Sequence, residues 1–545
     1  MIPKIKSSIP FLVVLITASS LFLFRLGANS LADWDEAWYA DASRFMFRRD
    51  HFLTPIWNGR YFFDKPPLQY WLTQPFLYIF GETELAYRLP SALAAIGLTL
   101  ITYVWGINFP SSARTPSELT NRGGGRRIGL SAAAILLTFP HFLDRGRSGN
   151  FDSLFVFFIT LSLFLMIKNR PALGGIFLGL SWLTKGVFSG LFPITVFFII
   201  AAIVKFAKLH ATNAGFANFK LKPLLIYIFS AIVIYAPWHI LEYTRFDHLI
   251  NQSYFATFDQ GEFGGVNWMD IAWRFDLRYL VFLWTFLRWW FPFLLISIIW
   301  QFHQTSERGR ARQDPDRFLP FISFVVIFLA LSAAKSKNDW YIMPAYPFIA
   351  LMIADFIFNI FRTIPIFWSL RQNIAGAPEP CTDALRERPA SNCVAVGGRR
   401  EVSLVRGFFL PFFFIFSVSI LNLYLYRRQA FPPDKWLPQK ELGLTVKNLT
   451  GPDDLVVTAE YEFPALRYYS EREVRTAARQ PDYEGKYWWI WDNTDIATAL
   501  RHGRDIITIH RPGAEWPIDV WGYRREKLTE TNGRIISRLL LQTPP

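Results

Sequence analysis

Cysteine, charge and metal-binding histidine patterns are all scarce in this chain of 545 residues. The two cysteines, Cys381 and Cys393, lie in a polar, arginine-containing segment, and we interpret them as free cytosolic thiols, which excludes a disulfide scaffold. The eight histidines show no H-E-x-x-H spacing, so the sequence does not support a zinc site. Charged residues make up only 18%, against about 25% in soluble proteins. These absences exclude a cytosolic enzyme and a disordered protein.

The low share of charged residues is matched by a high share of apolar ones. Hydrophobic residues make up 52% of the chain and aromatic residues 18%, and the mean hydropathy is +0.20. Because this mean combines very apolar stretches with a polar tail, we expect most of the chain to lie in a membrane. A net charge of +14 could suggest a nucleic-acid partner, but in a membrane protein the positions of Lys and Arg first of all set the topology.

A helix that crosses a bilayer needs about 20 mostly apolar residues. Roughly eleven segments qualify, some only marginally: about 9 to 26, 86 to 108, 128 to 142, 152 to 168, 171 to 184, 187 to 205, 223 to 241, 279 to 302, 318 to 334, 341 to 361 and 407 to 426. The first is similar to a signal peptide, because Lys4 and Lys6 precede an apolar run and Ala28-Asn29-Ser30 mimics a cleavage site. We interpret it as an uncleaved span.

A cytosolic N-terminus makes the topology consistent with the distribution of charge. Eleven crossings then place the basic loops 114–127, 205–222, 308–317 and 362–406 inside the cell, as the positive-inside rule requires. Residues 1–430 are thus predicted to form a multi-pass helical bundle in the plasma (inner) membrane. Residues 431–545 are predicted to form a small extracytoplasmic α/β domain, with strands near 455–458, 487–491 and 505–510 and a helix near 464–470. The predicted fold class is mainly α.

The first outward loop carries acidic residues at the membrane edge, where ionisable groups are functional candidates. Asp35 and Glu36 open a segment whose apolar and polar residues alternate with a helical period. One face has Trp38, Ala42, Phe45 and Met46, and the other has Asp41, Arg44 and Arg48. This spacing predicts an amphipathic helix in the interface plane, with the carboxylates of Asp35 and Glu36 at the level of the lipid headgroups. A solvated acidic loop is the alternative.

Basic residues recur at the outward ends of other predicted spans. Lys65 is followed by two prolines, which fix the backbone beside it. The others are Arg145 and Arg147, which precede Asp152, and Lys185, Lys335 and Lys337. Where the outer helix ends converge, these cations would form a pocket that suits a phosphate attached to a lipid. Taken singly, each is explained equally well as a snorkelling residue at a helix end.

Two further features have competing interpretations. His239 ends a predicted span, where it either contacts a substrate or is simply packed. Asp33-Trp34-Asp35 is a D-x-D sequence, the arrangement with which many nucleotide-sugar glycosyltransferases hold a divalent cation and a diphosphate. Since this loop is predicted to lie outside the cell, away from the nucleotide pool, we predict no metal ligands and no certain cofactor. A bound divalent cation is the alternative.

Several short motifs follow one another along residues 30–350. They are Asp35-Glu36, Phe62-Phe63-Asp64-Lys65-Pro66-Pro67-Leu68, Arg147 with Asp152, Gly179-Leu180-Ser181-Trp182-Leu183-Thr184-Lys185-Gly186, Pro237-Trp238-His239, and Lys337 with Trp340-Tyr341-Ile342-Met343-Pro344. As an ordered set they resemble the GT-C protein O-mannosyltransferase superfamily, and within it the bacterial aminoarabinose transferases that modify lipid A. Each motif taken alone is loose, so the resemblance rests on their order.

This resemblance implies a GT-C bundle that moves a sugar from a polyprenyl-phosphate donor to an acceptor hydroxyl or phosphate at the outer membrane face. The acceptor would be a lipid, a glycan or a protein, and no nucleic acid is involved. Asp35 is implied as the catalytic base, with Glu36 beside it. The predicted contacts to the donor phosphate combine this implication with the outward cations described above. They are Lys65, Arg147, Lys185, Lys335 and Lys337. The predicted contacts to substrate are Trp38, Tyr39, Phe62, Asp152, His239 and Tyr341.

The chain departs from the family pattern at two positions. Trp38 stands where aminoarabinose transferases carry an arginine, and Phe62 where they carry a tyrosine, so the sugar and the acceptor stay open. One carboxylate facing cations suits a single displacement with inversion. Retention would need a second carboxylate nearby, for which Asp152 is the candidate. The alternatives are a transporter or flippase of lipid-linked sugars and a non-catalytic membrane scaffold.

Overall fold

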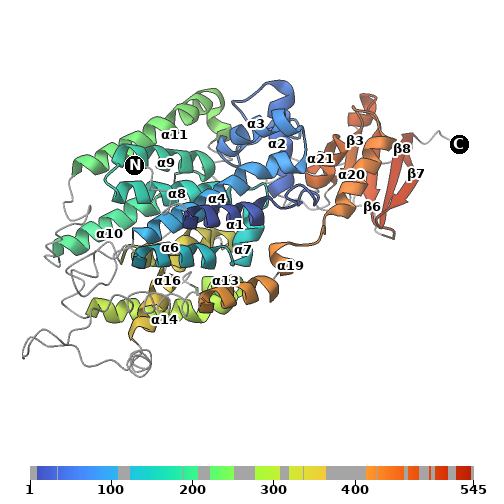
Figure 1. The fold of residues 1–545 in the computed structure, drawn as a ribbon. Coiled ribbons are helices and arrows are strands. Elements are labelled where there is room, and N and C mark those ends of the chain that lie inside the picture. The colour runs from blue at the N-terminus through green and yellow to red at the C-terminus, as the bar shows by residue number, and fades with distance from the viewer. Residues whose placement is uncertain are drawn as a thin grey trace, which may run out of the picture.

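The structure is a computed structural model of the whole chain. It describes residues 9–33, 35–108, 123–187, 190–206, 221–250, 276–306, 318–334, 337–363, 413–425, 427–458, 464–477, 490–491, 498–513 and 523–541. Cys381 and Cys393, Trp34 and Lys335 lie outside these ranges. Figure 1 shows a body of helices, with a sheet-containing unit at the end where α2 and α3 lie.

The helical body contains most of the helices in the described residues. They are α1 (Ile9–Leu23), α2 (Asp35–Arg49), α3 (Leu68–Phe80), α4 (Glu84–Ile107), α6 (Gly123–Leu136), α7 (Pro140–Gly146), α8 (Asp152–Ile167), α9 (Pro171–Lys185), α10 (Phe192–Phe206), α11 (Leu221–Ile250), α13 (Arg278–Leu287), α14 (Phe291–Ser306), α15 (Leu319–Ala333), α16 (Tyr346–Thr363) and α19 (Arg427–Ala430), with a helix at Phe413–Leu425 and short 3-10 helices η5 (Arg288–Trp290) and η7 (Asp339–Ala345). A small hairpin of β1 (Ile56–Trp57) and β2 (Arg60–Tyr61) lies between α2 and α3.

Several of these helices are suited to a bilayer. In the described part of the chain, four helices are long and apolar enough to cross one: Glu84–Ile107, Leu221–Phe246, Arg278–Gln301 and Asp339–Ile360. Ile9–Leu23, Asp152–Ile167, Leu319–Ala333 and Phe413–Leu425 are apolar but shorter. A helix lies at each of the eleven segments predicted to span, and the prediction of several apolar helices is confirmed. The number eleven stays a prediction.

The helices differ in how much of their surface the body covers. In α16, Phe348, Leu351 and Ile353 are completely buried. By contrast, α11 exposes Phe229 and Val233, and α14 exposes Ile299. Large exposed apolar faces of this kind suit contact with lipid tails, because exposing so much apolar surface to water is unfavourable.

Close packing of α8, α9 and α11 brings two charged residues together. A Cβ at Gly175 of α9 would lie 2.1 Å from the carbonyl oxygen of Tyr227 in α11, so only glycine permits this approach. Since α8 and α9 are joined by a tight turn, the first residue of α8, Asp152, and the last residue of α9, Lys185, lie at the same end of the pair.

The C-terminal unit, residues 431–545, has a mixed sheet. Its elements are α20 (Leu437–Leu449), β3 (Leu455–Thr458), α21 (Pro464–Ser470), β4 (Glu473–Ala477), β5 (Ile490–Trp491), β6 (Ile506–His510), β7 (Tyr523–Thr531) and β8 (Arg534–Leu541). The strand order is β5-β4-β3-β6-β8-β7, in which the first four strands run parallel and β8 and β7 are antiparallel additions. The small C-terminal α/β unit is confirmed, with β3, β6 and α21 where they were predicted. The domain boundary at residue 431 stays a prediction.

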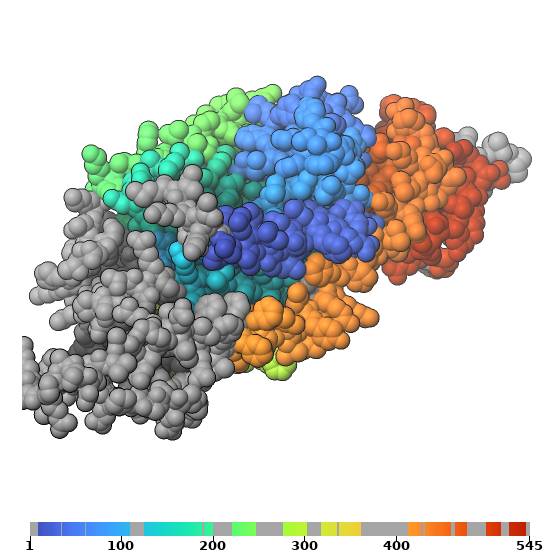
Figure 2. All heavy atoms as spheres, in the orientation of Figure 1, coloured from blue at the N-terminus to red at the C-terminus, as the bar shows by residue number. Residues whose placement is uncertain are grey.

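The C-terminal unit packs against α2. Figure 2 shows the orange atoms of this unit beside the blue segments, with its red atoms on the far side. The amphipathic helix after Asp35 is present as α2, but Asp41 and Arg44 of its polar face are covered by α21, whereas Arg48 at its end is exposed. The side chains of Asp41 and Arg44 are buried.

Candidate functional site

A buried carboxylate gathers two cations at the end of the helical body. Asp152, the first residue of α8, is 3% exposed. Its Oδ2 accepts a hydrogen bond from Arg145 Nε at 3.0 Å, and its Oδ1 pairs with the ammonium group of Lys185. Arg145 comes from α7 and Lys185 from the end of α9, so three helices meet at one carboxylate. A buried carboxylate needs such partners to remain ionised.

Asp35 lies beside this group. A nitrogen of the Arg145 guanidinium (Nη2) is 4.0 Å from Asp35 Oδ2, so Arg145 stands between the carboxylates of Asp35 and Asp152. About one third of the Asp35 side chain, 34%, is exposed. Asp35 therefore combines contact with a fixed cation and access for another molecule.

Lys65 joins the same site from the extended segment after β2. Its Nζ lies 3.3 Å from Asp64 Oδ2, and the Tyr39 hydroxyl donates a hydrogen bond to that oxygen at 3.3 Å. The Lys65 side chain is 27% exposed. We call Asp35, Asp64, Lys65, Arg145, Asp152 and Lys185 the charged cluster.

The surroundings of Asp35 raise the pKa of its carboxyl group. Burial is the largest cause, and the charges of Asp64 and Asp152 act in the same direction. The charges of Arg145 and Lys65 oppose it. Since both cations act on Asp35, the structure brings the predicted base and the predicted phosphate contact into one site.

The charged cluster differs from the cationic pocket expected from the sequence. With every group ionised, the six side chains carry three negative and three positive charges, because Asp64 and Asp152 accompany the cations. Asp152 fixes Arg145 and Lys185, whereas Lys65 is more exposed than either.

Aromatic rings border the cluster. The ring centroid of Tyr39 lies 4.4 Å from that of Phe151, in an edge-on arrangement. The ring of Trp38 contacts that of Phe62 at 6.1 Å. Tyr341 lies 5.3 Å from the ammonium nitrogen of Lys185, and Trp340 lies 4.9 Å from the guanidinium carbon of Arg145. These rings restrict the side chains of α2 and hold the cations in place.

Glu36 points away from Asp35 into the protein. Its oxygens accept hydrogen bonds from Arg88 Nε at 2.8 Å and Nη2 at 2.9 Å. The backbone N–H groups of Ala32 and Gly149 donate at 2.7 and 2.6 Å. Burial opposes ionisation, but Arg88 and these N–H groups outweigh it and lower the pKa of Glu36. Its predicted catalytic role stays a prediction, and its contacts are those of a residue that fixes the start of α2.

Arg147 and Lys337 lie outside the charged cluster. Arg147 donates to the backbone carbonyls of Leu21, Phe22 and Phe24, at 2.7 to 3.1 Å, so it holds the end of α1. Lys337 donates to the carbonyls of Ser332 and Ala334, both at 2.7 Å, which satisfies the end of α15. Both residues thus use their charge on helix ends.

His239 and Asp33 also have contacts within the protein. His239 Nδ1 lies 3.2 Å from the carbonyl oxygen of Tyr235, and its ring packs on the Tyr235 ring. Asp33 Oδ1 accepts a hydrogen bond from the Ala465 N–H of α21 at 3.0 Å. Among the described residues, no group of three His, Cys, Asp or Glu side chains is placed to hold a metal ion.

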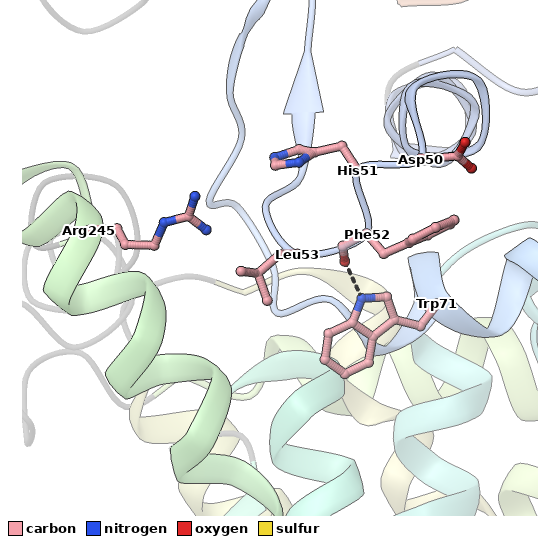
Figure 3. A pocket seen from close by; sticks show the side chains of 6 residues that line it. All are labelled: Asp50, His51, Phe52, Leu53, Trp71 and Arg245. Carbon is pink, nitrogen blue, oxygen red and sulfur yellow. Dashed lines mark hydrogen bonds between the residues drawn. The ribbon is translucent and has the colours of Figure 1, made fainter.

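A separate hollow of about 470 Å³ opens beside α3 and α11 (Figure 3). Its lining residues are Asp50, His51, Phe52, Leu53, Trp71 and Arg245. The indole N–H of Trp71 donates to the Phe52 carbonyl at 2.5 Å, which holds the connection after α2 against α3. None of the six lining residues belongs to the charged cluster.

Sequence reasoning missed Asp64 and Arg88, and it kept Arg147 in place of Arg145 among the predicted phosphate contacts. Arg145 was named among the outward cations, and it is the arginine that contacts Asp35 and Asp152. Asp64 lies within the Phe62-Phe63-Asp64-Lys65 motif yet was not singled out, although it shares oxygen Oδ2 with Lys65 and Tyr39. Arg88, inside a predicted span, was a charge in an apolar run, and that was the signal for a buried partner such as Glu36.

Comparison with known families identifies part of the chain. Residues 64–240 match the family described as dolichyl-phosphate-mannose-protein mannosyltransferase. This segment is similar to that mannosyltransferase family. It contains five of the six members of the charged cluster, namely Asp64, Lys65, Arg145, Asp152 and Lys185.

Relatives extend the mannosyltransferase similarity beyond this segment. An uncharacterized protein of Aquifex aeolicus (strain VF5) is 28% identical over 358 residues, which cover 64% of each chain. The undecaprenyl phosphate-alpha-4-amino-4-deoxy-L-arabinose arabinosyl transferase of Pectobacterium carotovorum is 24% identical over 377 residues, which cover 65% of this chain and 59% of that one. The chain therefore spans less than two thirds of the length of either relative. The resemblance to mannosyltransferases and aminoarabinose transferases is confirmed.

Solved structures confirm the fold. The crystal structure of ArnT from Cupriavidus metallidurans in the apo state matches with a TM-score of 0.66 at 16% identity, covering 98% of both chains. The structure of the same protein bound to undecaprenyl phosphate gives a TM-score of 0.65 at 15% identity, covering 97% of this chain and 98% of that one. The chain thus has the ArnT fold, and four of its described helices are long and apolar enough to cross a membrane. Its orientation in the membrane stays a prediction.

Replacing Glu36 with Gln tests the structural role of the Glu36–Arg88 pair. We expect this variant to lose about 3 to 5 kcal/mol of stability, because it leaves the Arg88 charge buried without a counter-charge. The measurement is the free energy of unfolding, or the melting temperature, of the protein purified in detergent.

Glu530→Gln is the matched control for this substitution. It removes the same charge from the exposed Lys527–Glu530 pair, whose atoms are 2.7 Å apart. We expect at most about 1 kcal/mol there. Equal stability of Glu36→Gln and the wild-type protein would contradict the assignment.

Proposed function

We propose that the chain is an integral-membrane glycosyltransferase. It moves a sugar from a polyprenyl-phosphate donor to an acceptor hydroxyl or phosphate at the outer membrane face, with Asp35 as base and with inversion at the sugar. The observation that carries this proposal is the position of Asp35. Its carboxylate is partly exposed and lies 4.0 Å from Arg145, within the electrostatic influence of Lys65.

The relatives support the class of donor. Several are named undecaprenyl phosphate-alpha-4-amino-4-deoxy-L-arabinose arabinosyl transferase. A structure with the same fold is described as bound to undecaprenyl phosphate. A polyprenyl phosphate attached to a sugar is therefore the donor class that we propose. Neither the sugar nor the acceptor follows from the charged cluster.

The reaction is a displacement at the anomeric carbon. The acceptor oxygen forms a bond to that carbon while the bond to the donor phosphate oxygen breaks. The proton of the acceptor hydroxyl passes to Asp35, and the polyprenyl phosphate leaves with the bonding electron pair. General-base assistance of this kind contributes about 10² to 10⁴ in rate.

The charge balance of the cluster suits this sequence of events. Before reaction the six ionised side chains sum to zero. When Asp35 takes the proton, the cluster becomes positive by one charge, at the moment when the departing phosphate becomes more negative. Lys65 and Arg145 then act on the leaving group as fixed cations whose orientation requires no rearrangement.

Roles within the cluster follow from its contacts. We assign Lys65 to the donor phosphate, because it is more exposed than the other cations of the cluster. We assign Arg145, in place of Arg147, to stabilising the carboxylate of Asp35 and the departing phosphate, and Asp152 with Lys185 to holding Arg145 in place. Trp38, Tyr39, Phe62 and Tyr341 line the space around them.

A transporter or flippase is less consistent with these positions. Transporters bind substrate near the bilayer midplane, on interrupted helices in paired repeats. The charged residues of the cluster instead lie at the start of α8, at the end of α9 and on α7. An end position suits chemistry at a membrane surface.

The proposal is tested with purified protein in detergent and a panel of radiolabelled polyprenyl-phosphate sugars. Release or transfer of sugar from one of them is the expected result. Consumption of soluble nucleotide sugars instead, or of no sugar at all, would overturn it.

Asp35→Asn is the first test of the mechanism. We expect transfer to be abolished, because the amide cannot accept the proton, while the protein remains as stable as the wild type. Asp453→Asn, at an exposed site of the C-terminal unit, is the control and should be fully active. Turnover of Asp35→Asn at the wild-type rate would remove Asp35 from the mechanism.

Lys65→Ala tests the phosphate contact. We expect it to weaken use of the lipid-phosphate donor by about 2 to 5 kcal/mol, the scale for losing one partner of a desolvated charge pair. The measurement is kcat/KM for the donor, with the exposed Lys527→Ala as the control. An unchanged kcat and donor KM would show that the phosphate binds elsewhere.

Arg145→Gln tests the electrostatics of the base through pH. A base works only when ionised, so the rate falls as the pH drops through the pKa of Asp35. Burial raises this pKa, Asp64 and Asp152 raise it further, and Arg145 and Lys65 lower it. Removing Arg145 should therefore move the acid limb of kcat/KM to higher pH. Arg145→Lys keeps the positive charge, so its acid limb should lie closer to that of the wild-type protein. An acid limb that stays in place or moves to lower pH would contradict the assignment.

A further inference from the structure

The two segments that carry Asp35 and Lys65 both touch the C-terminal unit. Asp35 is the first residue of α2, and Lys65 lies four residues beyond the end of β2. One continuous stretch, residues 464–475, which holds α21 and the start of β4, contacts both segments.

The contact with α2 involves buried charges. Arg44 donates a hydrogen bond from Nη1 to the Tyr468 carbonyl oxygen at 2.7 Å, and its guanidinium carbon lies 4.3 Å from the centre of the Tyr468 ring. Asp41 pairs with Arg44 and lies 3.4 Å from Arg467 Nε. Just before α2, Asp33 accepts from the Ala465 N–H at 3.0 Å. Burial makes these bonds costly to break, so α2 has little freedom to shift relative to α21.

The contact with the β1–β2 hairpin rests on one amide side chain. Asn58 Nδ2 donates to the Val474 carbonyl oxygen at 2.7 Å, and Asn58 Oδ1 accepts from the Val474 N–H at 3.3 Å. Asn58 is 3% exposed. In the described part of the chain, strand β4 pairs with β5 from Thr476 onward, and at Val474 the Asn58 amide bonds the backbone as a neighbouring strand would.

The hairpin transmits this contact to Lys65. Asn58 and Gly59 form its turn, with φ values of 50° and 77°, and β2 continues directly into Phe62-Phe63-Asp64-Lys65. The hairpin is short, and Phe62 N–H donates to the Pro55 carbonyl at 2.8 Å, so a shift of its turn displaces the segment that follows.

We propose that the C-terminal unit is a positioning element for the reaction, which sets the separation of Asp35 and Lys65. It does so by binding α2 through Arg44 and the β1–β2 hairpin through Asn58. This inference rests on the proposed function. Arg44 and Asn58 are positioning residues, since they reach the reaction only through Asp35 and Lys65. A misplacement of about 1 Å at a reacting group costs about 100-fold in rate.

Asn58→Gly is the substitution that isolates the hairpin contact. Glycine adopts the positive φ of this turn without strain, so the change removes the two hydrogen bonds to Val474 and leaves the turn intact. Asn532→Gly is the matched control. Asn532 begins the equivalent Asn-Gly turn between β7 and β8, with φ values of 49° and 69° for Asn532 and Gly533. Its Nδ2 donates to the Pro438 carbonyl at 3.0 Å and to Glu441 at 3.1 Å, within the C-terminal unit.

We expect Asn58→Gly to lower kcat by about 10-fold to 100-fold, with a smaller change in the donor KM. The acid limb of its pH profile should also move, to slightly lower pH, because Asp64 and Lys65 lie on the same segment and move away from Asp35 together, and the charge of Asp64 raises the pKa of Asp35 more than the charge of Lys65 lowers it. Asn532→Gly should keep the wild-type kcat and pH profile. Arg44→Lys keeps the charge but not the guanidinium contacts with both the carbonyl and the ring of Tyr468. It should also lower kcat, because α2 is then held less firmly.

The outcomes separate this inference from the proposed function. No sugar transfer by the wild-type protein would overturn the proposed function itself. Wild-type transfer that depends on Asp35, combined with unchanged kcat and pH profile in Asn58→Gly and Arg44→Lys, would overturn only the positioning role. So would a fall in melting temperature without a change in kcat, or an equal fall of kcat in Asn532→Gly.

Discussion

The arrangement of the site depends on one buried ion group, in which Asp152 holds Arg145 and Lys185. A carboxylate with 3% exposure cannot remain charged without partners, and two cations from separate helices supply them. Their attraction fixes the ends of α7, α8 and α9 relative to one another. Arg145 consequently stands in one place, at 4.0 Å from Asp35. The chemistry proposed for Asp35 therefore depends on Asp152, a residue that need not touch the substrate itself.

Helix α2 connects this group to the rest of the molecule. Its first residue, Asp35, faces Arg145, whereas Asp41 and Arg44 face α21 of the C-terminal unit. Glu36, next to Asp35, is bound by Arg88 and by two backbone N–H groups. One short helix thus presents a partly exposed acid on one side and is held by buried charges on the others. The carboxylate that we propose as the base is thereby held in one position by Glu36, Asp41 and Arg44, which take no part in the proposed reaction.

Periodicity and hydropathy predicted much of the fold, because long apolar runs have few alternatives to a membrane helix. A helix lies at each predicted segment, and α21 has the predicted bounds Pro464–Ser470. Strands β4, β7 and β8 were not predicted. β4 is short, β7 is rich in charged residues, and the apolar residues of β8 do not alternate with polar ones as in a half-buried strand. For the site, Asp35 and Lys65 could be found from motifs, but Arg145 and Arg147 are two residues apart and equally basic. Only the turn after α7 decides which of them faces Asp152 and which reaches Leu21.

The bond between Asp33 and Ala465 joins residues 432 positions apart. A ribosome makes the acidic loop long before α21, so α2 at first lacks the surface that later covers Asp41 and Arg44. If the C-terminal unit positions α2 as proposed, the charged cluster takes its final geometry only after α21 has been made.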